Sequence, residues 1–307
     1  MKPGGKRPTL GRDLSTAPSS PQDAAILKLL GDEDASVVKA VLQQLLADRA
    51  AAQARLERLL NEAAVTPNAA RELGAALGAL RREEAGKVLR AHCRKPEGLR
   101  SLSGLEEFCW KASLFHDPDA GPRIAAGRAQ IAAWGRTIRE QIAPGASDLE
   151  RAETLRLVLA EEAGLRGNAE RYYDPANSFL DRVVATRRGI PISLCAVYML
   201  AGAEAGIDVA PVGMPGHFLI RVGGHYIDPF HDGLAVGEDA LRELLERTGA
   251  AAEIEAVSAA WRVPVPWRLV AQRMAANLIH LYGEAGNDPA RERWETVAGW
   301  LEDEAEE

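Results

Sequence analysis

Apolar residues recur at helical spacing through most of the N-terminal half of the chain, from Ala24 to about Ile142. In the stretch AAILKLLGDEDASVVKAVLQQLLA they occupy positions 26, 27, 29 and 30, and then 37, 38, 41, 42, 45 and 46. This i, i+3, i+4, i+7 spacing is typical of amphipathic helices. The segment GDEDAS between the two runs supplies a glycine stop and acidic or serine cap candidates. The pattern predicts a hairpin that resembles a HEAT-repeat unit, with weaker periods up to about residue 92 and no strict repeat.

The pattern changes at about residue 150. Before it, GLEEFCWKASLFHDPDAGPRIAAGRAQIAAWGRTIREQI predicts two helices separated by the break HDPDAGP. After it, the pattern predicts a helix, an irregular polar loop, a short helix and then the long apolar helix PISLCAVYMLAGAEA. Pro191 suits the first turn of that last helix, because the N–H that proline lacks has no partner there. Gly206 suits the position that follows its last turn.

Three short segments after this helix have the composition of β-strands. DVAPVGM, GHFLIRV and HYIDPF are rich in β-branched and aromatic residues and are separated by Pro-Gly and Gly-Gly. Helical spacing returns in EDALRELLERTG and in PWRLVAQRMAANLIHLYGEAGNDPARERWETVAGWL, and the second of these predicts a helix–turn–helix hairpin. One hairpin cannot bury its own apolar face, so it should pack on the preceding domain. The predicted fold class is α+β, helix-rich, with a small antiparallel sheet packed on a central helix and flanked by α-helical hairpins.

Composition and charge narrow the class of protein. The chain is 47% hydrophobic and 26% charged, which is sufficient for a globular core without disulfides or metals. Its net charge of −7 provides no general attraction to phosphate backbones or anionic lipid, so we expect neither a nucleic acid nor a membrane partner. Three widely spaced cysteines and the lack of a membrane-spanning apolar run favour the reducing cytoplasm. The N-terminal MKPGGKRPTLGRDLSTAPSSPQD lacks the apolar stretch of a signal peptide and predicts a disordered tail.

The segment GMPGHFLIRVGGHYIDPFHDG concentrates three histidines and two aspartates in one predicted β-hairpin. The Gly-Gly dipeptide at 223–224 is typical of a two-residue turn, which pairs Arg221 with Tyr226. Because paired residues and alternate residues share a face, His217 and Asp228 lie diagonally across the ladder on one face, within reach of each other. The carboxylate then either orients the imidazole within a nucleophile–base–orienter triad or merely satisfies its hydrogen bond at the end of the sheet.

A metal site in this hairpin would need His225 or His231 to lie close to His217, because zinc requires three or four ligands. The register places His225 on the opposite face of the sheet, and His231 follows Phe230 in a turn. We therefore predict no metal ligands, and the sequence indicates no cofactor.

A triad would also need a nucleophile from the apolar helix that begins near Pro191. Cys195 lies about one turn inside this helix among apolar neighbours, which indicates burial, although a helix N-terminus can activate a thiol. Ser193 lies nearer the helix start, where a serine either caps the helix or is activated by a neighbouring histidine. The candidate catalytic residues are therefore His217, Asp228, Cys195 and Ser193.

Long motifs in the second half of the chain resemble a known family. GN…YYDP.NS, RRGIPISL, PGHFL.R and IDPF closely resemble the SirB family of the transglutaminase-like superfamily, over roughly residues 100 to 250. That superfamily is similar to papain-like proteins, with a nucleophilic cysteine at a helix N-terminus and a histidine and an aspartate on adjacent strands. The resemblance assigns these last two roles to His217 and Asp228. It places the cysteine near Pro191 to Ser193, where the chain reads GIPIS and contains no cysteine.

The resemblance and the helical patterns together imply four regions. These are a disordered tail (1–22), α-helical HEAT-like hairpins (23–95), a SirB-type transglutaminase-like domain (96–255) and a C-terminal hairpin that resembles a tetratricopeptide unit (256–307). We expect a bacterial cytoplasmic protein whose domain has lost its thiol nucleophile and serves as a regulatory or binding module for a protein or peptide partner. The alternative is a Cys- or Ser-dependent amide hydrolase or acyl transferase that uses His217 and Asp228. A nucleic-acid-associated regulator is disfavoured by the acidic balance of the chain.

Overall fold

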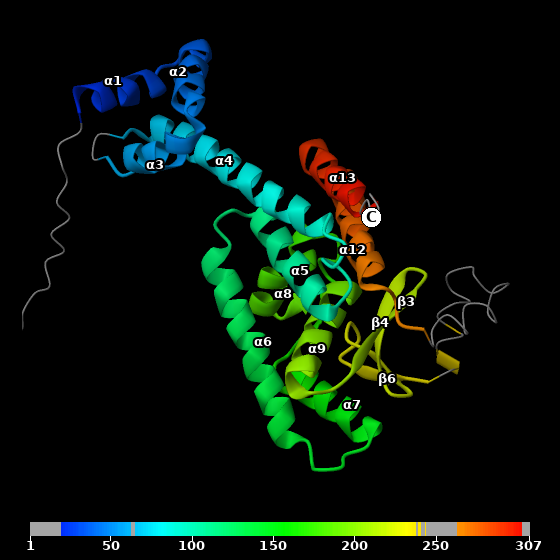
Figure 1. Ribbon diagram of the computed structural model, residues 1–307. Helices are drawn as coiled ribbons and strands as arrows, with labels where there is room; N and C mark the ends of the chain where they lie inside the picture. The colour runs from blue at the N-terminus through cyan, green and yellow to red at the C-terminus, as the bar shows by residue number, and fades with distance from the viewer. Residues whose placement is uncertain (1–19, 63–64, 238, 241–242, 244–262, 303–307) are drawn as a thin grey trace, which may run out of the picture. The chain divides into compact units, whose positions relative to one another are not determined.

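The computed structural model describes residues 20–62, 65–237, 239–240, 243 and 263–302, and Figure 1 shows their helices and strands. The chain forms two compact units, which divide within helix α4 (Pro67–Cys93) between Arg81 and Arg82. The domain boundary predicted from the sequence, after residue 95, lies beyond the end of this helix. Most of the predicted tail and of the predicted helix EDALRELLERTG lie outside the described residues.

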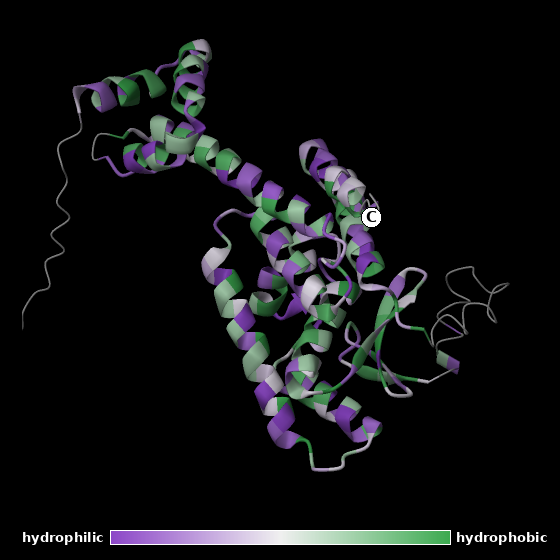
Figure 2. Ribbon diagram, in the orientation of Figure 1, coloured by the Kyte–Doolittle hydropathy of each residue, from purple (hydrophilic) through white to green (hydrophobic). Residues whose placement is uncertain are grey.

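The smaller unit is built from short helices with polar side-chain caps. It contains α1 (Pro21–Leu30), α2 (Ala35–Ala47), α3 (Arg49–Leu60) and the first part of α4. Gly31 follows α1, and Asp34 caps α2 by accepting a hydrogen bond from the Ser36 N–H at 2.8 Å, so the predicted glycine stop and acidic cap are both present. Apolar and polar residues alternate around these helices (Figure 2). The apolar faces form a leucine-rich core of Leu27, Leu30, Leu45, Leu56, Leu59 and Leu73.

The larger unit is built around one buried helix, α9 (Pro191–Ala205). Pro191 occupies its first turn and Gly206 follows its last turn with a φ of +78°, as the sequence pattern predicts. Nearly every residue of α9 is buried in a core that it shares with the surrounding helices. These helices are α5 (Leu102–His116), α6 (Gly121–Gln141), α7 (Asp148–Arg156) with its π-helical extension η1 (Leu157–Glu162), α8 (Leu180–Thr186), α12 (Trp267–Glu284) and α13 (Asp288–Glu302).

An antiparallel sheet of four strands packs against α9. Its strands follow one another in the order β3 (Val209–Met214), β4 (His217–Val222), β5 (His225–Asp228) and β6 (Leu234–Val236). Arg221 pairs with Tyr226 and Val222 pairs with His225, which confirms the predicted two-residue turn. Phe218 and other apolar residues of β4 join the core that contains α9. The hairpin on which the candidate site depends is therefore present in the predicted register.

The α+β fold class predicted from the sequence is confirmed, since a helix-rich chain carries one small antiparallel sheet. The prediction missed β6 and a parallel pair formed by β1 (Arg166–Gly167) and β2 (Arg188–Gly189), because two or three residues are too few to establish a strand period. A 3₁₀ turn, η2 (Pro175–Ser178), lies between β1 and β2 along the chain. None of the described helices is both long and apolar enough to cross a bilayer.

Candidate functional site

His217 is the first residue of β4, and a neighbouring helix holds its backbone. The guanidinium of Arg273, in α12, donates hydrogen bonds to the backbone carbonyls of Met214 and His217 at 2.5 and 2.7 Å. The same guanidinium lies over the ring of Phe218, 5.4 Å from its centroid. Arg273 therefore fixes the start of the strand, and with it the direction in which the imidazole leaves the backbone. Arg273 was not predictable from the sequence, because a helical pattern does not indicate which distant loop a long side chain reaches.

Asp228 ends β5 and accepts a hydrogen bond from His217. His217 Nε2 and Asp228 Oδ2 lie 2.7 Å apart, and only 11% and 8% of the two side chains is exposed. The other carboxylate oxygen, Oδ1, accepts hydrogen bonds from the backbone N–H groups of Phe230 and His231 at 3.0 and 3.3 Å. Side-chain acceptance from the N–H two residues on defines an Asx turn, which immobilises the carboxylate. The His217–Asp228 contact predicted from the hairpin register is thus present, and the two hydrogen bonds to Oδ1 orient the carboxylate.

His231 belongs to the same cluster, although the hairpin pattern predicts only that it follows Phe230 in a turn. Its Nδ1 lies 2.7 Å from Asp228 Oδ2, and its ring centroid lies 5.7 Å from that of His217. The Asx turn explains the difference, because the two N–H groups bound to Oδ1 curl the chain back over the carboxylate. Asp-Pro at the end of a strand favours turn initiation, but this signal does not specify which side chain of the turn returns to the carboxylate. His225, in contrast, pairs with Val222 away from the cluster.

The electrostatics of the cluster favour an ionised carboxylate. Burial alone raises the pKa of Asp228, but the hydrogen bonds and positive charge of His217 and His231 outweigh burial and hold this pKa below its ordinary value. Oδ2 is therefore an acceptor at neutral pH. When neutral His217 donates from Nε2 to this oxygen, its Nδ1 is the basic nitrogen. His217 can take a proton at Nδ1 from any donor that reaches it.

Ser193 serves as a helix cap and lies apart from the cluster. Its Oγ accepts a hydrogen bond from the Ile190 N–H at 3.1 Å and donates one to the Asn177 carbonyl at 2.6 Å. The side chain is fully buried, and a Cβ on Gly189 would lie only 2.8 Å from Oγ. The hydroxyl is therefore committed to the backbone around the start of α9. Within the described residues, no hydrogen bond joins it to His217.

Cys195 lies in the core where α9 meets β4. Its thiol donates a hydrogen bond to the Phe218 carbonyl at 3.5 Å, and the residue has no exposed surface. Burial raises the pKa of this thiol well above its ordinary value; the negative charge of Asp228 raises it further, and Arg273 opposes this effect only in part. The thiolate is the reactive form of cysteine, so this environment suppresses nucleophilic chemistry.

We expect none of the three thiols to react with Ellman's reagent in the native protein, and all three to react in denaturant. Cys93, Cys109 and Cys195 are all buried, and burial raises the pKa of Cys93 and of Cys109 to about 12. Absorbance at the thionitrobenzoate band counts the thiols that react. The Cys195→Ala variant should release two equivalents in denaturant and none without it. Fast native labelling that this variant abolishes would show that the Cys195 thiol is accessible and activated.

Aromatic rings border the histidine–aspartate cluster. The ring of Phe230 meets those of His217 and Tyr172 edge to face, with centroids 6.3 and 5.9 Å away. The Phe230 carbonyl accepts a hydrogen bond from the Gly167 N–H at 2.9 Å, and a Cβ at Gly167 would lie 2.6 Å from the Phe230 ring. Glycine is therefore required where β1 approaches the turn after β5. Tyr173 stacks edge-on against Tyr172 and is 64% exposed, so the aromatic border extends to the surface.

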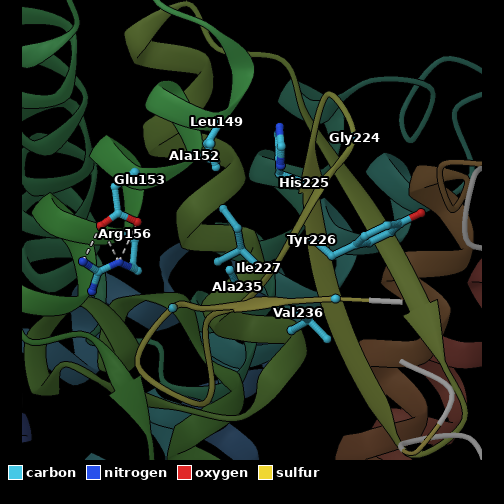
Figure 3. Close-up of a pocket in the computed structure, with 12 residues that line it drawn as sticks. Leu149, Ala152, Glu153, Arg156, Gly224, His225, Tyr226, Ile227, Ala235 and Val236 are labelled. Carbon is cyan, nitrogen blue, oxygen red and sulfur yellow. Dashed lines mark hydrogen bonds and ion pairs between the residues drawn. The ribbon is translucent and has the colours of Figure 1, made fainter. Parts of the chain in front are cut away.

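A separate pocket of about 340 Å³ lies between α7 and the strands β5 and β6 (Figure 3). Ile227 lines it from β5, and Glu153 and Arg156 form an ion pair on the wall that α7 provides. Tyr226 points away from α7 in the same view, as the alternation of side chains along β5 requires. None of the three residues of the histidine–aspartate cluster lines this pocket.

A protein-family model matches the central part of the chain. Residues 125–276 match the model of the transglutaminase-like superfamily, so the resemblance in the sequence motifs is confirmed at the level of the superfamily. This stretch includes α9, the four-stranded sheet, the four candidate catalytic residues, His231 and Arg273.

The chain is also similar to several curated proteins. It is 33% identical to a UPF0162 protein of Xylella fastidiosa over 145 residues, which are 46% of this chain and 50% of that one. It is 29% identical to a UPF0162 protein of Pseudomonas aeruginosa over 153 residues, or 49% of this chain and 55% of that one. F-box only protein 21 of Mus musculus is 31% identical over 148 residues, or 44% of this chain and 22% of that protein. The chain thus spans about half the length of its UPF0162 relatives, and no solved structure matches it.

Proposed function

We propose that the transglutaminase-like domain has no working nucleophile and acts in the cytoplasm as a regulatory module that binds a protein or peptide partner. The proposal rests on the hydrogen bonds and the burial of the two candidate nucleophiles. The Ser193 hydroxyl is held by backbone groups at the start of α9. The Cys195 thiol is buried and donates to the Phe218 carbonyl. Within the described residues, therefore, neither the Ser193 hydroxyl nor the Cys195 thiol is available for the basic Nδ1 of His217 to activate.

The start of α9 supports the same proposal. In the superfamily that the motifs resemble, the cysteine stands at the N-terminus of a helix, which corresponds here to Pro191 through Ser193. Pro191 has no nucleophilic atom, Ile192 is apolar and buried, and Ser193 caps the helix. A cysteine two residues further on emerges about 200° around the helix axis from Ser193, because each residue turns the helix by about 100°. The helix therefore contains a cysteine, but Cys195 does not lie at the position where the superfamily places its nucleophile.

The surroundings of the cluster support binding of a partner. Tyr173 presents an exposed aromatic ring at the outer end of the ring contacts that lead from His217 through Phe230 and Tyr172. Aromatic residues are enriched where protein interfaces gain most of their energy. The α12–α13 hairpin resembles a tetratricopeptide unit, a type of repeat that forms concave surfaces for peptides. The motifs resemble the SirB family, some members of which are linked to the regulation of genes, and this resemblance supports a regulatory role.

One observation favours a second function, a Cys- or Ser-dependent amide hydrolase or acyl transferase. His217 and Asp228 retain the geometry of a base and its orienting group, at 2.7 Å, which binding alone does not require. For this function Cys195 or Ser193 would have to exchange its backbone partner for His217. Such an exchange requires the start of α9 to move, since both side chains belong to the buried core.

Turnover measurements distinguish the two functions. We expect the purified full chain to show no amide or ester turnover above the buffer rate, because His217 has no nucleophile to activate. The probes are a glutamine-containing peptide with a fluorescent amine acceptor, and p-nitrophenyl acetate. Wild type, His217→Ala and Asp228→Asn should give equal rates. Turnover by the wild type that both substitutions abolish would overturn the proposal in favour of the hydrolase or acyl transferase.

A further inference from the structure

We propose that His217, Asp228 and His231 form a binding site for a divalent transition-metal ion of the zinc class. Each of the three side chains offers a ligand atom, and these atoms lie within 4.8 Å of one another. Two imidazole nitrogens and one carboxylate oxygen are a donor set that suits zinc and its neighbours rather than magnesium or calcium. The inference goes beyond the proposed function and does not depend on it, because it concerns His231, which no triad needs.

Asp228 is oriented as a ligand that binds through one oxygen. Both N–H groups of the Asx turn bind Oδ1, so that oxygen is already committed to the backbone. Oδ2 is directed to the space between the two imidazoles, 2.7 Å from a nitrogen of each. Hydrogen bonds of this kind, made to a ligand by groups that do not touch the ion, fix ligand orientation and raise affinity.

Two of the three side chains are nearly buried and the third is exposed, so the site has two fixed ligands and an entry path for an ion. Only 11% of the His217 side chain and 8% of that of Asp228 is exposed, whereas 57% of that of His231 is exposed. An ion can therefore approach from the side of His231. Three protein ligands leave one position of a tetrahedral ion to water or to a ligand from a partner, which is the arrangement of zinc sites that keep an open position.

The hydrogen-bonded form and the ion-bound form of the cluster compete. In the hydrogen-bonded form, both imidazoles donate to Oδ2 at 2.7 Å. Ligand bonds of about 2.0–2.1 Å at tetrahedral angles separate two ligand atoms by roughly 3.3 Å, so an ion moves each imidazole nitrogen about 0.6 Å further from Asp228 Oδ2. The exposed side chain of His231 can make most of this adjustment. Each imidazole must also carry its proton on the other ring nitrogen, Nδ1 of His217 and Nε2 of His231.

Calorimetric titration of the chelator-treated full chain with Zn²⁺ tests the site. We expect one ion per chain, with an affinity that falls about tenfold or more in His231→Asn, since one of three ligands is lost. His231 is largely exposed, so this variant should fold, and far-ultraviolet circular dichroism checks that it does. His225→Asn is the matched control, because His225 lies on the neighbouring strand and pairs with Val222. It should bind zinc like the wild type.

The visible absorption of bound Co²⁺ provides a second measurement. It would not change in a His231 variant if His231 had only a structural role. Co²⁺ bound to the wild type should show the intense visible absorption of four-coordinate cobalt, and His231→Asn should lose that absorption. Equal zinc affinity in the wild type and His231→Asn would overturn the proposal. So would an equal loss of affinity in His225→Asn, or the absence of saturable zinc binding by the wild type at micromolar concentrations.

Discussion

Replacing Trp294 with alanine is expected to lower the free energy of unfolding of the larger unit by about 3–5 kcal/mol. Trp294 lies in α13 and is only 2% exposed. Its ring packs on those of Phe115 and Phe179, with centroids 5.9 and 5.8 Å away, so it joins the C-terminal hairpin to α5 and to the turn before α8. Truncation removes the buried ring and leaves a cavity that the surrounding helices can fill only in part. A loss of this size is a large fraction of the stability of a typical domain.

Urea denaturation followed by tryptophan fluorescence measures this loss. All six tryptophans lie after residue 81, so their fluorescence reports on the larger unit alone, and five remain in the variant. Leu269→Ala is the matched control, because Leu269 lies on α12 of the same hairpin but is 51% exposed. It should change the stability by less than about 0.5 kcal/mol. A loss below 1 kcal/mol in Trp294→Ala would contradict the packing described for α13.

The stability of the larger unit is expected to fall as the pH drops from about 6.5 towards 4, with His116 responsible for a loss on the order of 3 kcal/mol. The ring of His116 stacks on that of Phe179, 3.9 Å between centroids, and its Nδ1 lies 3.2 Å from Tyr282 Oη. Burial lowers the pKa of His116 to about 4 from an ordinary value of 6.5, although Asp117 and Asp181 oppose this. The unfolded chain therefore takes up the proton first. The contribution is fully present above pH 6.5 and is lost as the pH falls to 4.

Unfolding free energies of His116→Gln at several pH values between 4 and 7.5 test this assignment. Glutamine does not titrate, so the variant should lose less stability than the wild type over this interval, whatever its absolute stability. Tyr282→Phe is the control, because it removes the hydroxyl next to the imidazole and keeps the titrating group. It should retain the pH dependence of the wild type. Identical pH dependence in His116→Gln and the wild type would assign the acid sensitivity to other groups.

Much of the fold followed from local patterns that act over a few residues. The periods of apolar residues predicted the helical hairpins, and Pro191 and Gly206 marked the ends of α9 at the residues where the structure has them. The β1–β2 pair was not predictable in this way, since its strands are two residues long and are joined by packing between distant segments. Local rules locate an element well when it is long enough for its period to appear.

For the candidate site, the sequence by itself determined the pairing of His217 with Asp228, because a two-residue turn sets the register and the register sets the shared face. Only the tertiary structure decided that His231 joins this pair, since periodicity ends with the strand and the turn follows from hydrogen bonds to Asp228 Oδ1. The tertiary structure also decided that the Ser193 hydroxyl binds backbone groups and that the Cys195 thiol is buried. The partners of these two side chains, the carbonyls of Asn177 and Phe218, lie 16 and 23 residues away along the chain. Contacts at such separations depend on how α9 packs on η2 and on β4, and local sequence patterns do not predict that packing.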